Sequence, residues 1–214
     1  KIYTSVLALA LVSSGVLAQS SNSNEAIQLD KQAAPKVINN GKAAKLAPEQ
    51  HKDAQIEIWS DDFADPSTWV IDHDETACSL DFEIGIGLEC EGFAPIVSIN
   101  STTAANGYAM VDSDEYGGET GGSEVEDSWI TTADPIDLTG YPNVIIEFES
   151  QYRAWTYEKC FVVISTTNTD WPELDPDFDE NSDPNVFNVW PGMETQDPVD
   201  NPTTIRINIS EAAG

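Results

Sequence analysis

Positive charge is scarce in this chain. Its 214 residues include nine Lys and Arg against 38 Asp and Glu, for a formal net charge of −29. After Lys52 only Arg153, Lys159 and Arg206 are basic. A surface this acidic repels nucleic-acid phosphates and anionic lipid headgroups, so neither is an expected partner. The acidity has two ordinary causes, solubility in salty surroundings and carboxylates that converge on Ca²⁺, and we expect both.

The sequence also lacks the short motifs of common hydrolases. It contains no H-E-x-x-H zinc motif and no G-x-S-x-G nucleophile elbow, and its only histidines are His51 and His73. Carboxylate pairs of the kind that hydrolyse glycosides are so abundant that no particular pair is informative. We therefore predict a protein that is not an enzyme.

No apolar run approaches the roughly 20 residues that a membrane-spanning helix needs. The chain starts with basic Lys1, continues with an apolar run over 6–12, and reaches the small residue Ala18 before polar Gln19. This is the pattern of a secretory signal peptide. We predict a signal peptide over 1–18, then a flexible polar linker over 19–55, and a protein that is secreted or held at the cell surface.

Cysteine is rare as well, with three residues in the chain. In an exported protein, Cys78 and Cys90 are close enough in sequence to form a disulfide around one short loop. Cys160 lies within a candidate strand, where it is either a buried thiol or the partner of a cysteine beyond residue 214. Without a C-x-x-C motif, a zinc site is a poor interpretation.

Strand signals dominate the rest of the chain. Residues 144–152 alternate apolar and polar side chains, which places Ile146 and Phe148 on one face and Glu147 and Glu149 on the other. Further candidate strands cover 56–59, 107–111, 128–131, 160–164 and 204–210. No long helical period follows Gln55. We predict one all-β domain over 56–214, a jelly-roll β-sandwich that stops soon after a strong strand and so lacks its last strands.

Several segments resemble, in their order and spacing, the choice-of-anchor J or cleaved-adhesin modules of exported bacterial proteins. The resemblance extends from about Trp59 to Gly214. The segments that carry it are Asp61–Trp69, with its F…P…W pattern, Ser101–Asp114, which ends in D-S-D, Asp127–Thr132, Pro135–Leu138 and Phe148–Trp171. The chain departs from the family at Ala133, where a proline is usual, and in the absence of a closing D-D-V strand.

The resemblance implies a concanavalin-like jelly roll that often carries bound Ca²⁺. Carboxylates from separated loops could meet at one end of such a sandwich, where the ion would neutralise their repulsion. The candidate ligands are Asp61, Asp62, Asp112, Ser113, Asp114 and Asp127. The alternative is a solvated acidic rim without an ion.

Aromatic side chains near strand ends can stack on sugar rings. Trp155, Tyr157 and Trp171 are the candidates for such ligand contacts. The alternative is that these residues cap the core, and a single sequence favours that alternative.

Together these features predict a noncatalytic, calcium-stabilised adhesion or carbohydrate-binding module of a larger exported bacterial protein. Its expected partners are an extracellular glycan or surface protein and the downstream domains of the same polypeptide. The alternative is an accessory module of an exported hydrolase, a protease or glycosidase, whose catalytic domain lies beyond residue 214. A purely structural spacer is the third possibility.

Overall fold

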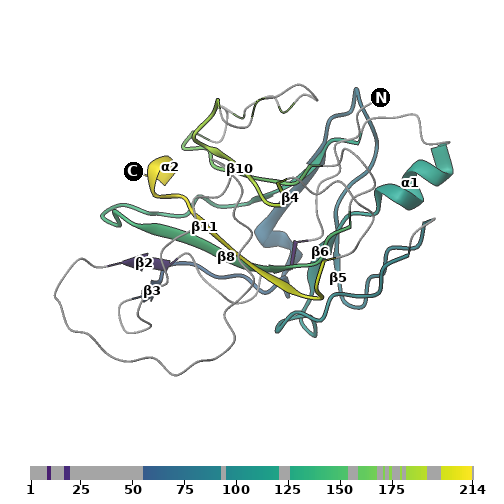
Figure 1. Cartoon of the computed structure of the whole chain (residues 1–214), viewed down its shortest axis with the longest axis horizontal. Coiled ribbons are helices and arrows are strands. Elements are labelled where there is room, and N and C mark those ends of the chain that lie inside the picture. Colours follow the sequence, from purple (N-terminus) through teal and green to yellow (C-terminus); the bar gives the residue numbers. More distant parts are fainter. Residues whose placement is uncertain are drawn as a thin grey trace.

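The computed structural model describes residues 9–10, 17–19, 55–92, 95–120, 126–153, 159–167, 171, 174, 179, 182–191 and 199–213. Strands dominate these residues and helices are few, which confirms the all-β prediction at the level of class (Figure 1). The strands are β1 (Leu9–Ala10), β2 (Leu17–Gln19), β3 (Gln55–Glu57), β4 (Trp69–His73), β5 (Glu83–Gly85), β6 (Tyr108–Met110), β7 (Ser128–Thr132), β8 (Val144–Ser150), β9 (Phe161–Val163), β10 (Val186–Asn188) and β11 (Thr203–Asn208). The helical elements are the 3₁₀ turn η2 (Pro66–Thr68), α1 (Ser113–Thr120) and α2 (Ser210–Ala213).

The largest sheet is built around the antiparallel pair β8–β11. Its register runs from Thr203 opposite Ser150 to Asn208 opposite Ile145, and the two strands lie side by side in Figure 1. The other edge of β8 pairs with β1 and β2, and β2 continues to β3. Three two-stranded ribbons, β4–β7, β5–β6 and β9–β10, complete the pairing among the described strands.

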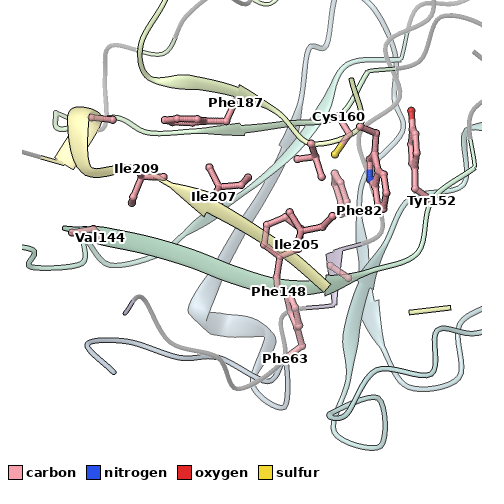
Figure 2. Close-up of a cluster of buried hydrophobic side chains, with 14 residues drawn as sticks. Phe63, Phe82, Val144, Phe148, Tyr152, Cys160, Phe187, Ile205, Ile207 and Ile209 are labelled. Atoms are coloured by element: carbon pink, nitrogen blue, oxygen red, sulfur yellow. The ribbon is translucent and has the colours of Figure 1, made fainter. Parts of the chain in front are cut away.

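The core forms where the alternating strands turn their apolar side chains inward. Ile205, Ile207 and Ile209 are all buried, as the period-2 pattern predicts, and Phe148 on β8 has no exposed surface. Figure 2 shows these side chains together with aromatic residues from other segments, including Phe63, Phe82 and Phe187. Because the cluster joins segments distant in sequence, it holds the ribbons onto the main sheet.

All of the predicted strands occur, with boundaries that differ by at most two residues. Five further strands of the described residues, β1, β2, β4, β5 and β10, were not predicted. Each has five residues or fewer, so the alternation that marks a strand extends over few positions. The sheets of the described residues are small, and the jelly-roll arrangement itself stays a prediction.

Two short pieces at the predicted signal peptide are described, namely β1 and β2, and both pair with β8. Whether the segment is cleaved stays a prediction, as does the linker over 19–55. Among the described residues, no helix has the length and apolar character needed to cross a bilayer.

Candidate functional site

The β4–β7 ribbon has two chemically different faces. In its register Ile71 lies opposite Ile130, and both pack against the main core with Trp69. Since side chains alternate along a strand, the neighbouring positions must point the other way. The ribbon therefore turns an apolar face to the core and presents a second face to solvent.

The outward face carries an exposed indole surrounded by acidic groups. Val70 lies opposite Thr131, and Asp72 lies opposite Trp129. The amide of Asp74 donates to the carbonyl of Asp127 at 2.9 Å, which extends the same ladder by one step. We call this surface the Trp129 face, and it consists of Val70, Asp72, Asp74, Asp127, Trp129 and Thr131.

The apolar part of the Trp129 face is open to solvent. Trp129 is 38% exposed and Val70 is 51% exposed. Their positions are diagonal across the ribbon, where long side chains are still within reach of each other. An exposed indole beside an exposed valine forms a flat apolar surface on which a ligand can stack.

The acidic part of the Trp129 face contains a pair of carboxylates that oppose each other. Burial raises the pKa of Asp127, and the neighbouring charge of Asp74 raises it further. Asp74 accepts hydrogen bonds from the hydroxyl and the amide of Thr76, and these lower its own pKa. Asp74 therefore remains ionised, and the repulsion between the two groups raises the pKa of Asp127.

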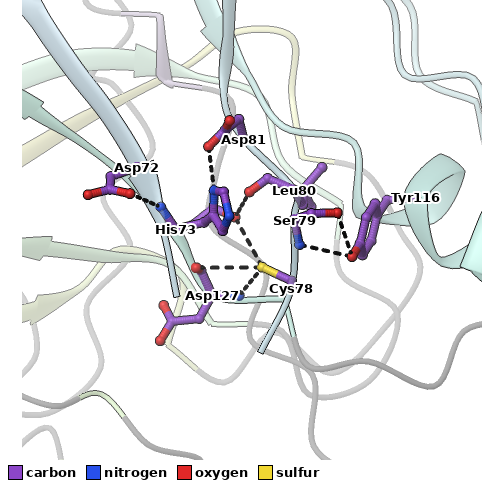
Figure 3. A network of polar contacts seen from close by, with 9 residues as sticks. Asp72, His73, Cys78, Ser79, Leu80, Asp81, Tyr116 and Asp127 are labelled. Atoms are coloured by element: carbon purple, nitrogen blue, oxygen red, sulfur yellow. Dashed lines mark hydrogen bonds and ion pairs between the residues drawn. The ribbon is translucent and has the colours of Figure 1, made fainter. Parts of the chain in front are cut away.

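A polar network behind the ribbon holds the face in position (Figure 3). His73 Nδ1 lies 2.8 Å from Asp81 Oδ1, and this contact raises the pKa of the imidazole, with further contributions from the charges of Asp72 and Glu75. In the figure the imidazole points toward Asp81, whereas the carboxylates of Asp72 and Asp127 point away from Cys78. Within the described part, His73 has no hydrogen bond to a serine or cysteine, so its pairing with Asp81 serves to fasten the loop.

The same loop is tied to β7 and to α1. The amide of Asp127 donates to Cys78 Sγ at 3.4 Å, and the Ser128 hydroxyl donates to the carbonyl of Leu80. The amide of Ser79 donates to the hydroxyl of Tyr116 on α1 at 3.0 Å. These bonds connect distant segments, so they restrict the ends of β4 and β7 where the acidic groups lie.

The predicted metal ligands Asp61 and Asp62 lie on one loop, and both are engaged with protein donors. Asp61 accepts bonds from the amide of Phe63, the indole of Trp69 and the hydroxyl of Thr68. These bonds hold Phe63, which is buried at a φ of 59°, in a left-handed conformation that is rare for an aromatic residue. Asp62 accepts from Asn106 Nδ2 at 2.7 Å and from the amide of Ala64 at 3.1 Å.

Asp112, Ser113 and Asp114 form the start of α1. The carbonyl of Asp112 accepts the first helical bond from Tyr116, and its Oδ1 accepts the amide of Glu115 at 3.1 Å, so Asp112 is the N-cap. Its Oδ2 accepts the amide of Glu91 at 2.6 Å. Ser113 and Asp114 occupy the first turn of the helix, where a negative charge is favourable.

The six predicted ligands therefore lie in three local settings: the Phe63 loop, the start of α1 and the Trp129 face. Within the described residues, no group of three or more His, Cys, Asp or Glu side chains is placed to hold a metal ion. In this arrangement the carboxylates of Asp61, Asp62 and Asp112 serve as hydrogen-bond acceptors for the protein itself. Calcium binding stays a prediction from the sequence.

The predicted disulfide is not formed in the structure, where Cys78 and Cys90 are free thiols. Cys78 Sγ is engaged with the backbone of Asp127. Burial, together with the nearby carboxylates of Asp112 and Asp114, raises the pKa of Cys90 to about 12. The thiolate needed for exchange is strongly disfavoured there, so proximity in sequence was not a sufficient reason for pairing.

The aromatic candidates have different outcomes. Trp155 and Tyr157 lie outside the described residues, and Trp171 is 43% exposed. Another tryptophan near a strand end, Trp190, is buried and stacks on Tyr152 with ring centroids 5.7 Å apart, as a core-capping residue would.

Sequence reasoning placed Trp129 in a strand without assigning it to the surface. The signal for its exposure was nevertheless present. Within β7 it alternates with Ser128 and Ile130 and shares its side of the strand with Thr131, and with Asp127 just before the strand. A tryptophan with polar neighbours at positions i±2 is expected on the solvent side.

Comparison of the chain with protein-family models, with curated proteins and with solved structures finds no match.

Proposed function

We propose that this chain is a noncatalytic, extracellular binding module that holds a glycan on the Trp129 face, as part of a larger exported bacterial protein. The observation that carries the proposal is the exposed indole of Trp129 on a ribbon whose opposite side is anchored in the core. A rigid platform favours binding because little conformational entropy is lost when the ligand arrives.

The composition of the face supports a polyol ligand. A pyranose ring has an apolar face that can lie on an indole, and its hydroxyl groups can donate to carboxylates at its edge. Asp72 lies directly across the ladder from Trp129, and Asp127 lies two positions away on the same side of the strand. Exposed indole and acceptor oxygens are thus adjacent, as a sugar ring requires.

The proposal also includes the arrangement of the strands as a jelly-roll sandwich. A jelly-roll sandwich is supported by the long antiparallel pair β8–β11, by the shared core that links the ribbons to it, and by the order of family-like segments along the chain. In such a sandwich the β4–β7 ribbon forms part of an outer surface.

The test is a glycan screen followed by titration calorimetry with the full chain. Truncation of an aromatic residue at the centre of a binding surface costs about 2 kcal/mol, so Trp129→Ala should weaken binding roughly thirtyfold. The matched control is Ile86→Ala, which truncates an exposed apolar side chain outside the face and should retain the affinity. Unfolding curves should show that both variants keep the wild-type fold.

Three outcomes would contradict the proposal. The first is that no glycan binds, and the second is that Trp129→Ala binds as tightly as the wild type. The third is hydrolysis of the bound glycan that is lost on replacing one specific carboxylate, which would make the protein an enzyme.

Calcium stabilisation is proposed separately and has its own measurement. An ion that binds only the folded state raises the unfolding midpoint as its concentration increases. The midpoint in Ca²⁺ should therefore exceed that in EDTA, and Asp62→Ala should reduce the difference. An unchanged midpoint at millimolar Ca²⁺ would leave the acidic loops as a solvated surface.

A further inference from the structure

The negative charge around Trp129 is concentrated within one step of the β4–β7 ladder. Directly opposed residues of an antiparallel pair have Cβ atoms about 5 Å apart, and same-face neighbours along a strand are separated by about 7 Å. Asp72 is opposite the indole, Asp127 is its neighbour along β7, and Asp74 is opposite Asp127. Three carboxylates thus border one exposed aromatic ring.

A protein cation that acts on this group is the imidazole of His73, on the inner side of the ribbon. It is paired with Asp81, its pKa is raised further by the charge of Asp72, and its charge lowers the pKa of Asp74. The ion pair of Arg206 with Glu147 lies on the β8–β11 sheet and involves none of the three carboxylates. One imidazole cannot balance three carboxylates, so the face keeps a net negative charge toward the solvent.

A bound cation would interact favourably with the face in two ways. The repulsion between Asp74 and Asp127 would be offset by a positive charge placed between or beside them. The exposed indole of Trp129 attracts cations through the negative electrostatic potential of its ring face. An acidic glycan carrying uronate or sulfate groups would be repelled by the same charges, and a neutral one would gain the stacking contact and hydroxyl hydrogen bonds but no attraction between opposite charges.

We infer that the Trp129 face recognises an amino-sugar glycan, with a pyranose ring stacked on Trp129 and its ammonium groups held by Asp72, Asp74 and Asp127. This inference rests on the proposed glycan-binding function and narrows its ligand to the cationic class. The ammonium group supplies three N–H donors, which matches a site made of acceptor oxygens. The sugar ring supplies the apolar surface that a simple cation lacks.

The experiment compares two oligosaccharides that differ in whether their amino groups are free and charged or acetylated and neutral. Oligomers of β-1,4-linked glucosamine and their fully N-acetylated counterparts have the same linkage and length, but only the first are cationic. Titration of the full chain at about pH 6, in EDTA and low salt, should give about tenfold tighter binding of the glucosamine oligomer. The advantage should shrink as salt screens the charges.

Isosteric variants separate the charge from the platform. Asp72→Asn and Asp127→Asn should each weaken glucosamine binding several-fold and leave binding of the N-acetylated oligomer unchanged. Glu89→Gln, which removes one exposed carboxylate away from the face, is the control for net charge and should change neither affinity. Trp129→Ala should weaken binding of both oligomers.

The possible failures are distinguishable. If both oligomers bind equally, or the N-acetylated one binds better, the amino-sugar inference is overturned while glycan binding stands. If neither binds and other glycans also fail, both proposals are overturned. If an oligolysine of equal charge binds as tightly as the glucosamine oligomer, and Trp129→Ala has no effect on either, the face attracts any cation and recognition of a sugar is refuted.

Discussion

Replacing Asp112 with alanine removes one carboxylate that accepts two backbone amides from different parts of the chain. One is the amide of Glu115, inside the first turn of α1, and the other is the amide of Glu91 in a preceding loop. Asp112 is 9% exposed, so water can replace these bonds only in part. The substitution therefore tests whether Asp112 is a structural cap or a metal ligand.

The expected magnitude follows from the two contacts. Loss of an N-cap costs about 1 kcal/mol, and loss of a hydrogen bond to a charged acceptor costs roughly 1.5–3 kcal/mol. Because one side chain accepts both bonds, we expect the free energy of unfolding to fall by about 3 kcal/mol. For a chain of this size it would lower the unfolding midpoint by about 6–12 °C. Asp112→Asn keeps an acceptor oxygen and should lose about 1 kcal/mol.

Denaturant unfolding of the full chain, followed by circular dichroism in EDTA and again in Ca²⁺, measures the effect. Asp114→Ala is the matched control, because it removes an acidic residue from the same helical turn without removing the cap, and should cost well under 1 kcal/mol. The capping role predicts the same destabilisation by Asp112→Ala in both solutions. A loss seen only in Ca²⁺, or a loss below about 0.5 kcal/mol in EDTA, would refute the capping argument.

Three other predictions concern pH and backbone conformation. The folded pKa of Asp127 is raised, so stability should fall as pH rises from about 3.8 through the folded pKa. Asp127→Asn should therefore raise the midpoint at neutral pH, by a margin that shrinks toward pH 3.8; equal midpoints at neutral pH would contradict this. The raised pKa of His73 has the opposite sign, because the contact with Asp81 stabilises the protein fully below the unfolded pKa of about 6.5, and this contribution is lost as pH rises through the folded value. His73→Gln should remove that part of the pH dependence of unfolding, and an unchanged profile would argue against it. Gly107→Ala should destabilise by about 1–3 kcal/mol, since φ is 153° and a Cβ would lie 2.6 Å from the carbonyl oxygen of Phe63; a variant as stable as the wild type in denaturant would show that the loop relaxes freely.

The candidate site shows how far local sequence could lead. Trp129 could have been assigned to the surface by its parity with Asp127 and Thr131, because alternation is a local property of a strand. Its pairing with Asp72 could not, because β4 is short and carries an aspartate within its apolar pattern. The register of two strands separated by more than fifty residues depends on contacts that neither strand encodes alone.

The roles of the carboxylates, by contrast, could not be predicted from the local sequence. An abundance of aspartates in loops is compatible with calcium, with caps and with turns, since each role needs the same acceptor oxygens. The structure assigns Asp61 to the support of Phe63, Asp112 to the start of α1, and Asp127 to a half-buried acidic pair. Which donor reaches a given carboxylate depends on the path of the backbone between loops, which composition does not encode.

By itself the sequence determined the all-β class, the inward faces of β8 and β11, and the acidic character of the surface. These follow from residue type and period-2 spacing, which act over a few neighbouring residues. The tertiary structure alone decided that Cys78 and Cys90 remain thiols, that the aspartates have separate tasks, and that an indole lies among three carboxylates on one ribbon. Those features depend on which distant segments meet, and the packing of the whole core determines those meetings.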